Sequence, residues 1–253
     1  MNKLILCFVL LVLNSGGLSA AEITVAVASN FKYTLQKLAA DFKIETGHDL
    51  IISSASSGKL FAQIVQGAPY DVFLSADENR VDLLILKKFA RVESAYIYAV
   101  GKLVLIANVR NNGNCTDVLK ASTLRHLAIA NPKIAPYGVA AKQVLANLKL
   151  WHKLQTRLVM GENIAQTFQF VATKNAGAGF VSQSMLNMAM HKNSNMAAFS
   201  CVWNIPRELY SPINQKMVIL NKTQNRLAVQ AFSRYIKSHR AREIIINTGY
   251  DVR

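Results

Sequence analysis

Acidic residues, cysteines and recognisable catalytic motifs are all scarce in this sequence. Its 253 residues include 14 Asp and Glu, 3 Cys and 5 His, and aromatic residues make up 8%. It contains no Gly-x-x-x-x-Gly-Lys-Ser/Thr loop, no Gly-x-Ser-x-Gly elbow, no Cys-x-x-Cys pair and no histidine pair at metal-ligand spacing. A hydrolase, which needs a nucleophile and a base, therefore has no support. We expect a protein that is not an enzyme and that uses no cofactor.

The shortage of acidic residues leaves a strongly basic chain. The 29 Lys and Arg give a formal net charge of +15 and a pI of about 9.9, which raises the question of nucleic acid. However, the basic residues are scattered, and the densest cluster, Lys237–Arg242, has no interleaved aromatics and is typical of a solvated helix face. We expect no nucleic-acid partner. An envelope protein that binds polyanions remains an alternative, and its binding would weaken steeply with salt.

The N-terminal residues have the order of a secretory signal peptide. A positive start, Met1–Lys3, precedes the apolar run Leu4–Leu13 and the small residues of Leu18–Ala21. We predict a signal peptide over residues 1–21, cut after residue 20 or 21, and export to the periplasm. The apolar run is too short to span a bilayer comfortably. In an exported chain Cys115 and Cys201 can form a disulfide, and two free thiols are the alternative.

Apolar periodicity in the rest of the chain predicts alternating strands and helices. Strands are expected at 22–28, 50–52, 71–75, 102–107, 127–130, 176–181 and 216–220, and helices at 31–45, 60–65, 76–85, 118–124, 139–148, 164–173, 225–238 and 241–248. Residues 92–97 are expected to be irregular or extended. We predict an α/β fold of two lobes, with lobe I at 22–101 plus 214–253 and lobe II at 102–213. Two chain crossings, near 99–103 and 210–216, would join them.

Four turns of this pattern are rich in neutral hydrogen-bond donors. They are Ser29-Asn30, Ser56–Gly58, Pro136–Gly138 and Asn163-Ile164, two from each lobe, and most of them stand where a helix is predicted to begin. Backbone N–H groups at helix N-termini, backed by the helix dipole, favour anions. The turns therefore indicate a site for a small oxyanion without an opposed Lys or Arg. The simpler alternative is that these serines only cap helices.

Five segments between about residue 22 and the C-terminus carry a resemblance: Val27–Phe31, Ser54–Leu60, Gly67–Asp77, Asn131-Pro132 and Ala135–Gly138. Together they resemble the periplasmic molybdate-binding proteins of ABC importers. The resemblance implies a type II periplasmic-binding-protein fold whose lobes close on molybdate or tungstate. It also implies a membrane permease as partner, and we expect a monomer. A receptor for another small oxyanion, such as sulfate, is the alternative on the same fold.

The resemblance also carries a set of ligand positions onto this chain. Ser29 and Ser57 would each donate a hydroxyl and a backbone N–H, while Asn30, Tyr137 and Ile164 would donate backbone N–H groups. The oxyanion, and its metal atom with it, would be held through these residues alone. Many members have a ligand tyrosine where this chain has Ser182, whose hydroxyl is too short to replace it, so Ser182 is the weakest candidate.

Overall fold

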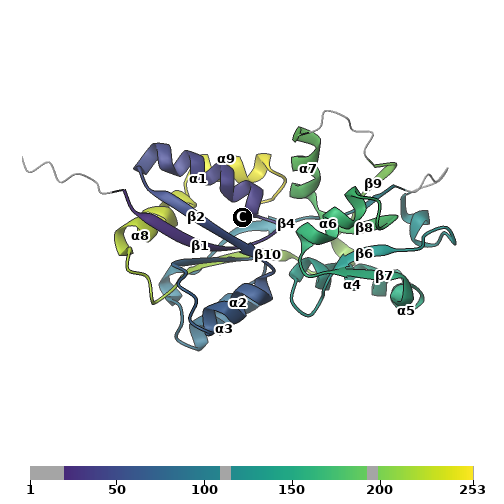
Figure 1. Cartoon of the computed structure of the whole chain (residues 1–253), viewed down its shortest axis with the longest axis horizontal. Coiled ribbons are helices and arrows are strands. Elements are labelled where there is room, and N and C mark those ends of the chain that lie inside the picture. Colours follow the sequence, from purple (N-terminus) through teal and green to yellow (C-terminus); the bar gives the residue numbers. More distant parts are fainter. Residues whose placement is uncertain (1–19, 109–114, 193–198, 253) are drawn as a thin grey trace, which may run out of the picture.

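The computed structural model describes residues 20–108, 115–192 and 199–252 and places two α/β lobes side by side (Figure 1). The fold class expected from the sequence is confirmed. Residues 1–19 of the predicted signal peptide lie outside the described residues. Over the described part of the chain, no helix combines the length and the apolar character that crossing a membrane requires.

Lobe I is built on a sheet with the strand order β2-β1-β3-β10-β4. Its strands are β1 (Glu22–Ala28), β2 (Asp49–Ala55), β3 (Val72–Ser75), β4 (Tyr96–Gly101) and β10 (Ile213–Ile219). Its helices are α1 (Lys32–Thr46), α2 (Ser57–Val65), α3 (Asn79–Leu86), α8 (Arg226–Tyr235) and α9 (His239–Asn247). β1 pairs in parallel with β2 and β3, so the turns that follow β1 and β2 leave the sheet at the same edge.

Both faces of this sheet are covered, as the alternation along β1 requires. Ile23, Val25 and Val27 pack in one apolar cluster with residues of α1, α8 and α9. Ala26, between them, faces a second cluster formed with α2 and α3. Figure 1 shows these two groups of helices on opposite sides of the sheet. The strands that lead to the turns are therefore held from both sides.

Lobe II repeats the plan with the strand order β7-β6-β8-β5-β9. Its strands are β5 (Leu103–Ala107), β6 (Leu127–Ala130), β7 (Leu158–Gly161), β8 (Ala178–Ser182) and β9 (Cys201–Asn204). Its helices are α4 (Pro136–Asn147), α5 (Trp151–Leu154), α6 (Ile164–Ala172) and α7 (Gln183–Lys192). β6 runs parallel to β7 and β8, whereas β5 is antiparallel to β8 and β9.

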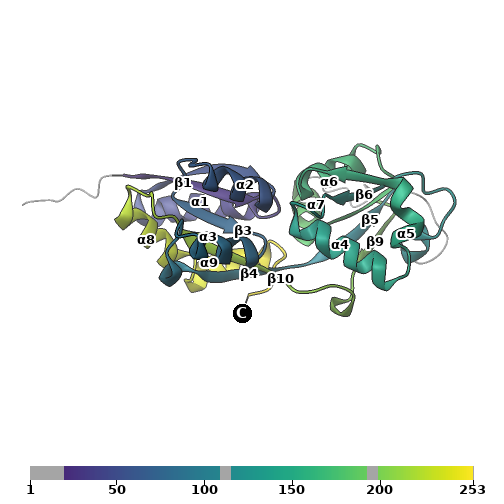
Figure 2. The same ribbon diagram turned by 90° about the horizontal axis from the view of Figure 1, so that it is seen from below.

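Two segments join the lobes, and both are visible in Figure 2. Lys102 alone separates β4 in lobe I from β5 in lobe II, and residues 205–212 lead back from β9 to β10. α8 and α9 then pack on lobe I against α1. The C-terminal Asp251 forms an isolated antiparallel bridge with Val100 beside the first crossing.

The structure corrects one expectation about local elements and adds detail that the sequence pattern did not provide. The helix expected over 118–124 is a 3₁₀ turn, Cys115–Leu119, since Ser122 and Thr123 favour turns over helix. In the segment 92–97, a 3₁₀ turn at Val92–Ser94 leads directly into β4. The strand β9, which no sequence pattern predicted, pairs with β5 at the far edge of lobe II.

Cys115 and Cys201 form a disulfide in the structure, with their Cα atoms 5.6 Å apart. Their sequence separation is 86 residues. The bond links the 3₁₀ turn to the start of β9, and both cysteines pack against the large apolar cluster of lobe II.

Candidate functional site

The turn after β1 brings Ser29 and Asn30 to the boundary between the lobes. The N–H of Ser29, expected as a ligand donor, instead donates to the carbonyl of Ala55 at 2.9 Å and prolongs the β1–β2 ladder by one residue. Within the described residues, the hydroxyl of Ser29 and the N–H of Asn30 make no hydrogen bond to protein. Ser29 thus offers its hydroxyl and Asn30 its backbone N–H.

At the start of α2, one serine caps the helix and a different serine offers its donors to the site. Ser56 is the N-cap, and its hydroxyl accepts from the N–H of Lys59 at 3.4 Å. Ser57 is the first helical residue, and its hydroxyl oxygen accepts from the N–H of Ala76 at 3.0 Å. The Ser57 hydroxyl hydrogen and N–H therefore remain available, because the first N–H groups of a helix have no intrahelical acceptor.

Two helix N-termini supply the donors of lobe II. Tyr137 is the second residue of α4, directly after Pro136, which has no N–H. Ile164 is the first residue of α6, whose cap Asn163 accepts from the next two N–H groups at 3.0 and 3.1 Å. Neither Tyr137 nor Ile164 has a backbone N–H partner in the part of the chain that the structure describes.

These groups line one small cavity between the lobes. Its volume is about 10 Å³, close to the minimum that holds one water molecule. The residues that line it are Ala28, Ser29, Asn30, Ser56, Ser57, Ala76, Ala135, Pro136, Tyr137 and Ile164. The structure thus brings together five of the six candidates. Ser182 does not line the cavity; its hydroxyl contacts that of Ser184 at 3.1 Å.

No lining residue of this cavity is charged. Six donors converge on it: the N–H groups of four residues and the hydroxyls of two serines. Three helices begin there, so their dipoles add a positive potential. Burial raises the pKa of the Tyr137 phenol well above its ordinary value, which keeps that side chain neutral. Such a site favours a small anion without burying a cation opposite it.

Direct contacts close the two lobes around the cavity. The N–H of Gly58 in α2 donates to the carbonyl of Ile134 in lobe II at 2.9 Å, and Lys59 pairs with Glu162 at 3.6 Å. A methyl group on Gly58 would lie 2.9 Å from the same Ile134 oxygen. The glycine is therefore required for the lobes to approach this closely, a role that the sequence pattern alone did not indicate.

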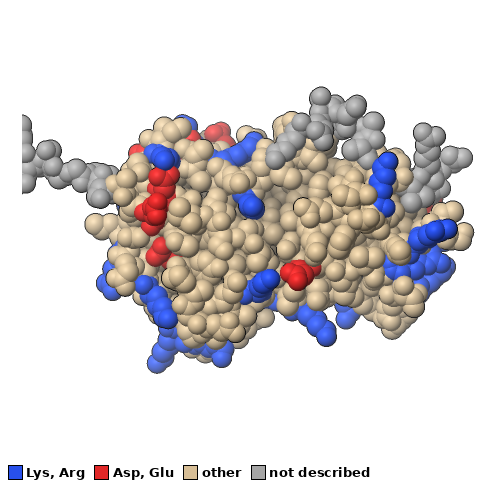
Figure 3. Space-filling view, viewed as in Figure 1, with Lys and Arg blue, Asp and Glu red and all other residues tan. Residues whose placement is uncertain are grey.

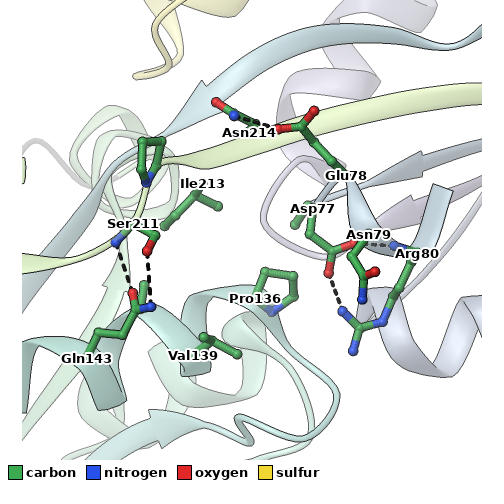
Figure 4. A pocket seen from close by; sticks show the side chains of 13 residues that line it. Asp77, Glu78, Asn79, Arg80, Pro136, Val139, Gln143, Ser211, Ile213 and Asn214 are labelled. Carbon is green, nitrogen blue, oxygen red and sulfur yellow. Dashed lines mark hydrogen bonds and ion pairs between the residues drawn. The ribbon is translucent and has the colours of Figure 1, made fainter. Parts of the chain in front are cut away.

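A larger groove of about 440 Å³ lies next to the cavity and shares Ala76 and Pro136 with it (Figure 4). Three pairs of its polar side chains interact: Gln143 with Ser211, Asn214 with Glu78, and Arg80 with Asp77. Because it presents two carboxylates, this groove is less suited to an anion than the cavity. Elsewhere, the Lys and Arg side chains stand in separate groups over both lobes on the face in Figure 3.

Comparison with known proteins identifies the family of this chain. Residues 23–251 match the bacterial extracellular solute-binding proteins. The chain belongs to this family. Among curated members, it is 44% identical to the molybdate-binding protein ModA of Azotobacter vinelandii, over 91% of this chain and 90% of the relative. It is 39% identical to the ModA of Rhodobacter capsulatus, over 92% and 89%.

Solved structures give two further comparisons. The periplasmic molybdate-binding protein of Azotobacter vinelandii superposes with a TM-score of 0.83 at 39% identity, covering 91% of this chain and 99% of that chain. The sulfate-binding protein SubI of Mycobacterium tuberculosis superposes with a TM-score of 0.72 at 10% identity, covering 91% and 86%, which is a likeness of fold alone. The resemblance to molybdate-binding proteins drawn from the sequence is confirmed.

Proposed function

We propose that this solute-binding protein captures molybdate or tungstate in the small cavity and delivers it to the membrane permease of an ABC importer. It would do so in the periplasm, after removal of the signal peptide, as a monomer and without a cofactor. The observation that carries the proposal is the convergence of six neutral donors from four turns on one small cavity. The names of the relatives at 44% and 39% identity support the choice of oxyanion.

The mechanism follows from where the donors lie. Ser29, Asn30 and Ser57 belong to lobe I, and Tyr137 and Ile164 belong to lobe II. An anion bound between them contacts both sets only when the lobes are closed, so binding shifts the population toward the closed state. Opening would return the anion to solvent or to the permease.

Selectivity would come from the size of the cavity, since sulfate, molybdate and tungstate share tetrahedral shape and charge. An anion of the wrong size leaves buried donors unpaired, and each unpaired donor costs about 1–3 kcal/mol. The alternative is a receptor for sulfate or another small oxyanion on the same fold.

Thermal unfolding of the mature protein with molybdate, tungstate, sulfate or phosphate tests the proposal. A ligand at a hundred times its Kd that binds only the folded state should raise Tm by about 5–10 °C. We expect a rise with molybdate and tungstate only, which the double variant Ser29→Ala/Ser57→Ala abolishes. The control Ser94→Ala/Ser238→Ala removes two lobe I hydroxyls outside the cavity and should keep the rise. An equal rise with sulfate supports the alternative, and no rise with any oxyanion refutes both.

A further inference from the structure

Behind the cavity, a continuous set of buried polar groups connects the two lobes. It consists of Asn30, Tyr98, Gln215 and Tyr250 from lobe I and Tyr137, Ser182 and Ser184 from lobe II, and each residue is at most 2% exposed. We call this set the interlobe network. Buried polar groups of this kind are costly unless all are satisfied, so a complete network marks one arrangement of the two lobes.

Gln215 is the centre of the network on the lobe I side. Its side-chain oxygen accepts from the Asn30 amide at 2.8 Å and from the Tyr98 hydroxyl at 3.1 Å. Its amide nitrogen donates across the lobes to the Tyr137 hydroxyl at 3.4 Å. The pairing of β10 with β4 shifts register between Gln215 and the next residue, and such bulges redirect a side chain.

The backbone at the crossing also leaves room for the phenol of Tyr137. A methyl group on Gly101, the last residue of β4, would overlap the Tyr137 hydroxyl and lie 3.0 Å from the Gln215 amide nitrogen. The Tyr137 side chain therefore rests on the crossing, while its backbone N–H lies at the cavity. Tyr137 thus connects the candidate site to the chain crossing between the lobes.

Asn30 joins the network to the cavity from the other lobe. Its carbonyl accepts from the Tyr250 hydroxyl at 2.7 Å and from the Ser184 hydroxyl at 3.1 Å. Its side-chain amide donates to Gln215 and, at 3.0 Å, to Tyr250. Among the hydrogen-bond donors of Asn30, the backbone N–H is the one left for the cavity.

Ser184, near the start of α7, makes the contact from lobe II. Besides the Asn30 carbonyl, its hydroxyl contacts the Tyr250 hydroxyl at 2.9 Å and that of Ser182 at 3.1 Å. Ser182, the weakest ligand candidate of the sequence, thereby has a place behind the site instead of in it. The hydroxyl of Ser184 bonds to lobe I only while the lobes are together.

We propose that the interlobe network is a latch, in which Ser184, Gln215 and Tyr250 stabilise the closed lobes and hold the N–H groups of Asn30 and Tyr137 at the ligand. This rests on the proposed function, since it assigns positioning residues for the same anion. The lobe-crossing bonds break on opening, so removing one penalises the closed state alone. Affinity should then fall without a matching loss of folding stability in the open protein.

The test compares Ser184→Ala with Ser94→Ala. Both remove a buried serine hydroxyl, but that of Ser94 bonds only within lobe I, to the Arg91 carbonyl at 2.6 Å and the Ile219 N–H at 2.9 Å. For Ser184→Ala we expect the Kd for molybdate to rise about 5- to 20-fold, mostly through faster dissociation. For Ser94→Ala we expect a lower Tm and a Kd within about twofold of the wild type.

A second measurement separates the latch from the proposed function. Spin labels at Gln36→Cys in lobe I and Lys153→Cys in lobe II, both exposed positions, report the closed fraction of the ligand-free protein. Ser184→Ala should lower that fraction and Ser94→Ala should not. If the wild type binds neither molybdate nor tungstate, the proposed function fails and the label distances still judge the latch. Equal closed fractions in Ser184→Ala and Ser94→Ala, or an equal rise in Kd for both variants, would overturn the latch proposal.

Discussion

Replacing Gly58 with alanine should stabilise the protein and weaken its ligand binding at the same time. Gly58 lies in the first turn of α2, without a positive φ, so alanine suits the local backbone. The exchange of glycine for alanine in a helix is worth about 0.5–1 kcal/mol. In a protein of this size, that corresponds to a rise in the ligand-free Tm of about 1–4 °C.

The same substitution should destabilise the closed arrangement of the lobes. The new methyl group would lie 2.9 Å from the Ile134 oxygen and 3.0 Å from the Ile134 Cα and Cβ, which belong to the other lobe. Overpacking of this kind costs about 1–3 kcal/mol, and here the cost falls on the closed state only. We therefore expect the Kd for molybdate to increase about 5- to 150-fold.

Calorimetric titration of the samples measures the expected increase in the Kd for molybdate, and thermal unfolding of the same samples measures the expected rise in Tm. The reverse exchange at an exposed position of the same helix, Ala62→Gly, serves as the control. It should lower Tm and leave the Kd unchanged, since it adds no atom between the lobes. If Gly58→Ala binds molybdate as tightly as the wild type does, close approach of these two segments is not needed for binding, and our account of closure is wrong.

Three further predictions concern stability and charge. Cys115→Ala/Cys201→Ala should lower the free energy of unfolding in denaturant by about 2–4 kcal/mol and leave the Kd for molybdate unchanged, because the disulfide lies at the far edge of lobe II. Burial raises the pKa of Tyr250 to about 12, and it raises the pKa values of Tyr98 and Tyr137 well above the ordinary 10. The folded state therefore holds these protons more tightly than the unfolded chain, so their contribution to stability should be complete below pH 10 and should fall as the pH rises through 12, measured as Tm against pH. Molybdate affinity should change little between low and moderate salt, whereas a steep decrease would favour the polyanion-binding alternative.

The sequence predicted seven of the ten described strands and the four donor-rich turns, because these depend on local patterns, but it did not predict β4, β7 or β9. The pattern placed Asn163-Ile164 at the start of a predicted helix, and the resemblance identified the N–H of Ile164 as a ligand donor. The resemblance suggested the N–H of Ser29 as a donor, but that group is used by the β1–β2 ladder, whose register a single sequence does not show.

Contacts between the lobes were out of reach for a more general reason. Ser184 is 154 residues from Asn30, and Tyr137 is 78 residues from Gln215, and no periodicity relates positions so far apart. Nor does a glycine in a turn reveal what it faces. The sequence placed Gly58 in a donor-rich turn, and its close approach to Ile134 became visible only with both lobes in place.

A cavity lined mainly by backbone N–H groups has a consequence for how such proteins diverge. Every amino acid except proline carries the same N–H, so Ile164 could be exchanged for many other residues without removing the donor. Selection at such a position would then act on the path of the main chain and hardly on residue identity. Distant relatives could keep the same ligand with few identical residues around it. A replacement by proline would remove the donor N–H and would therefore indicate a change of site.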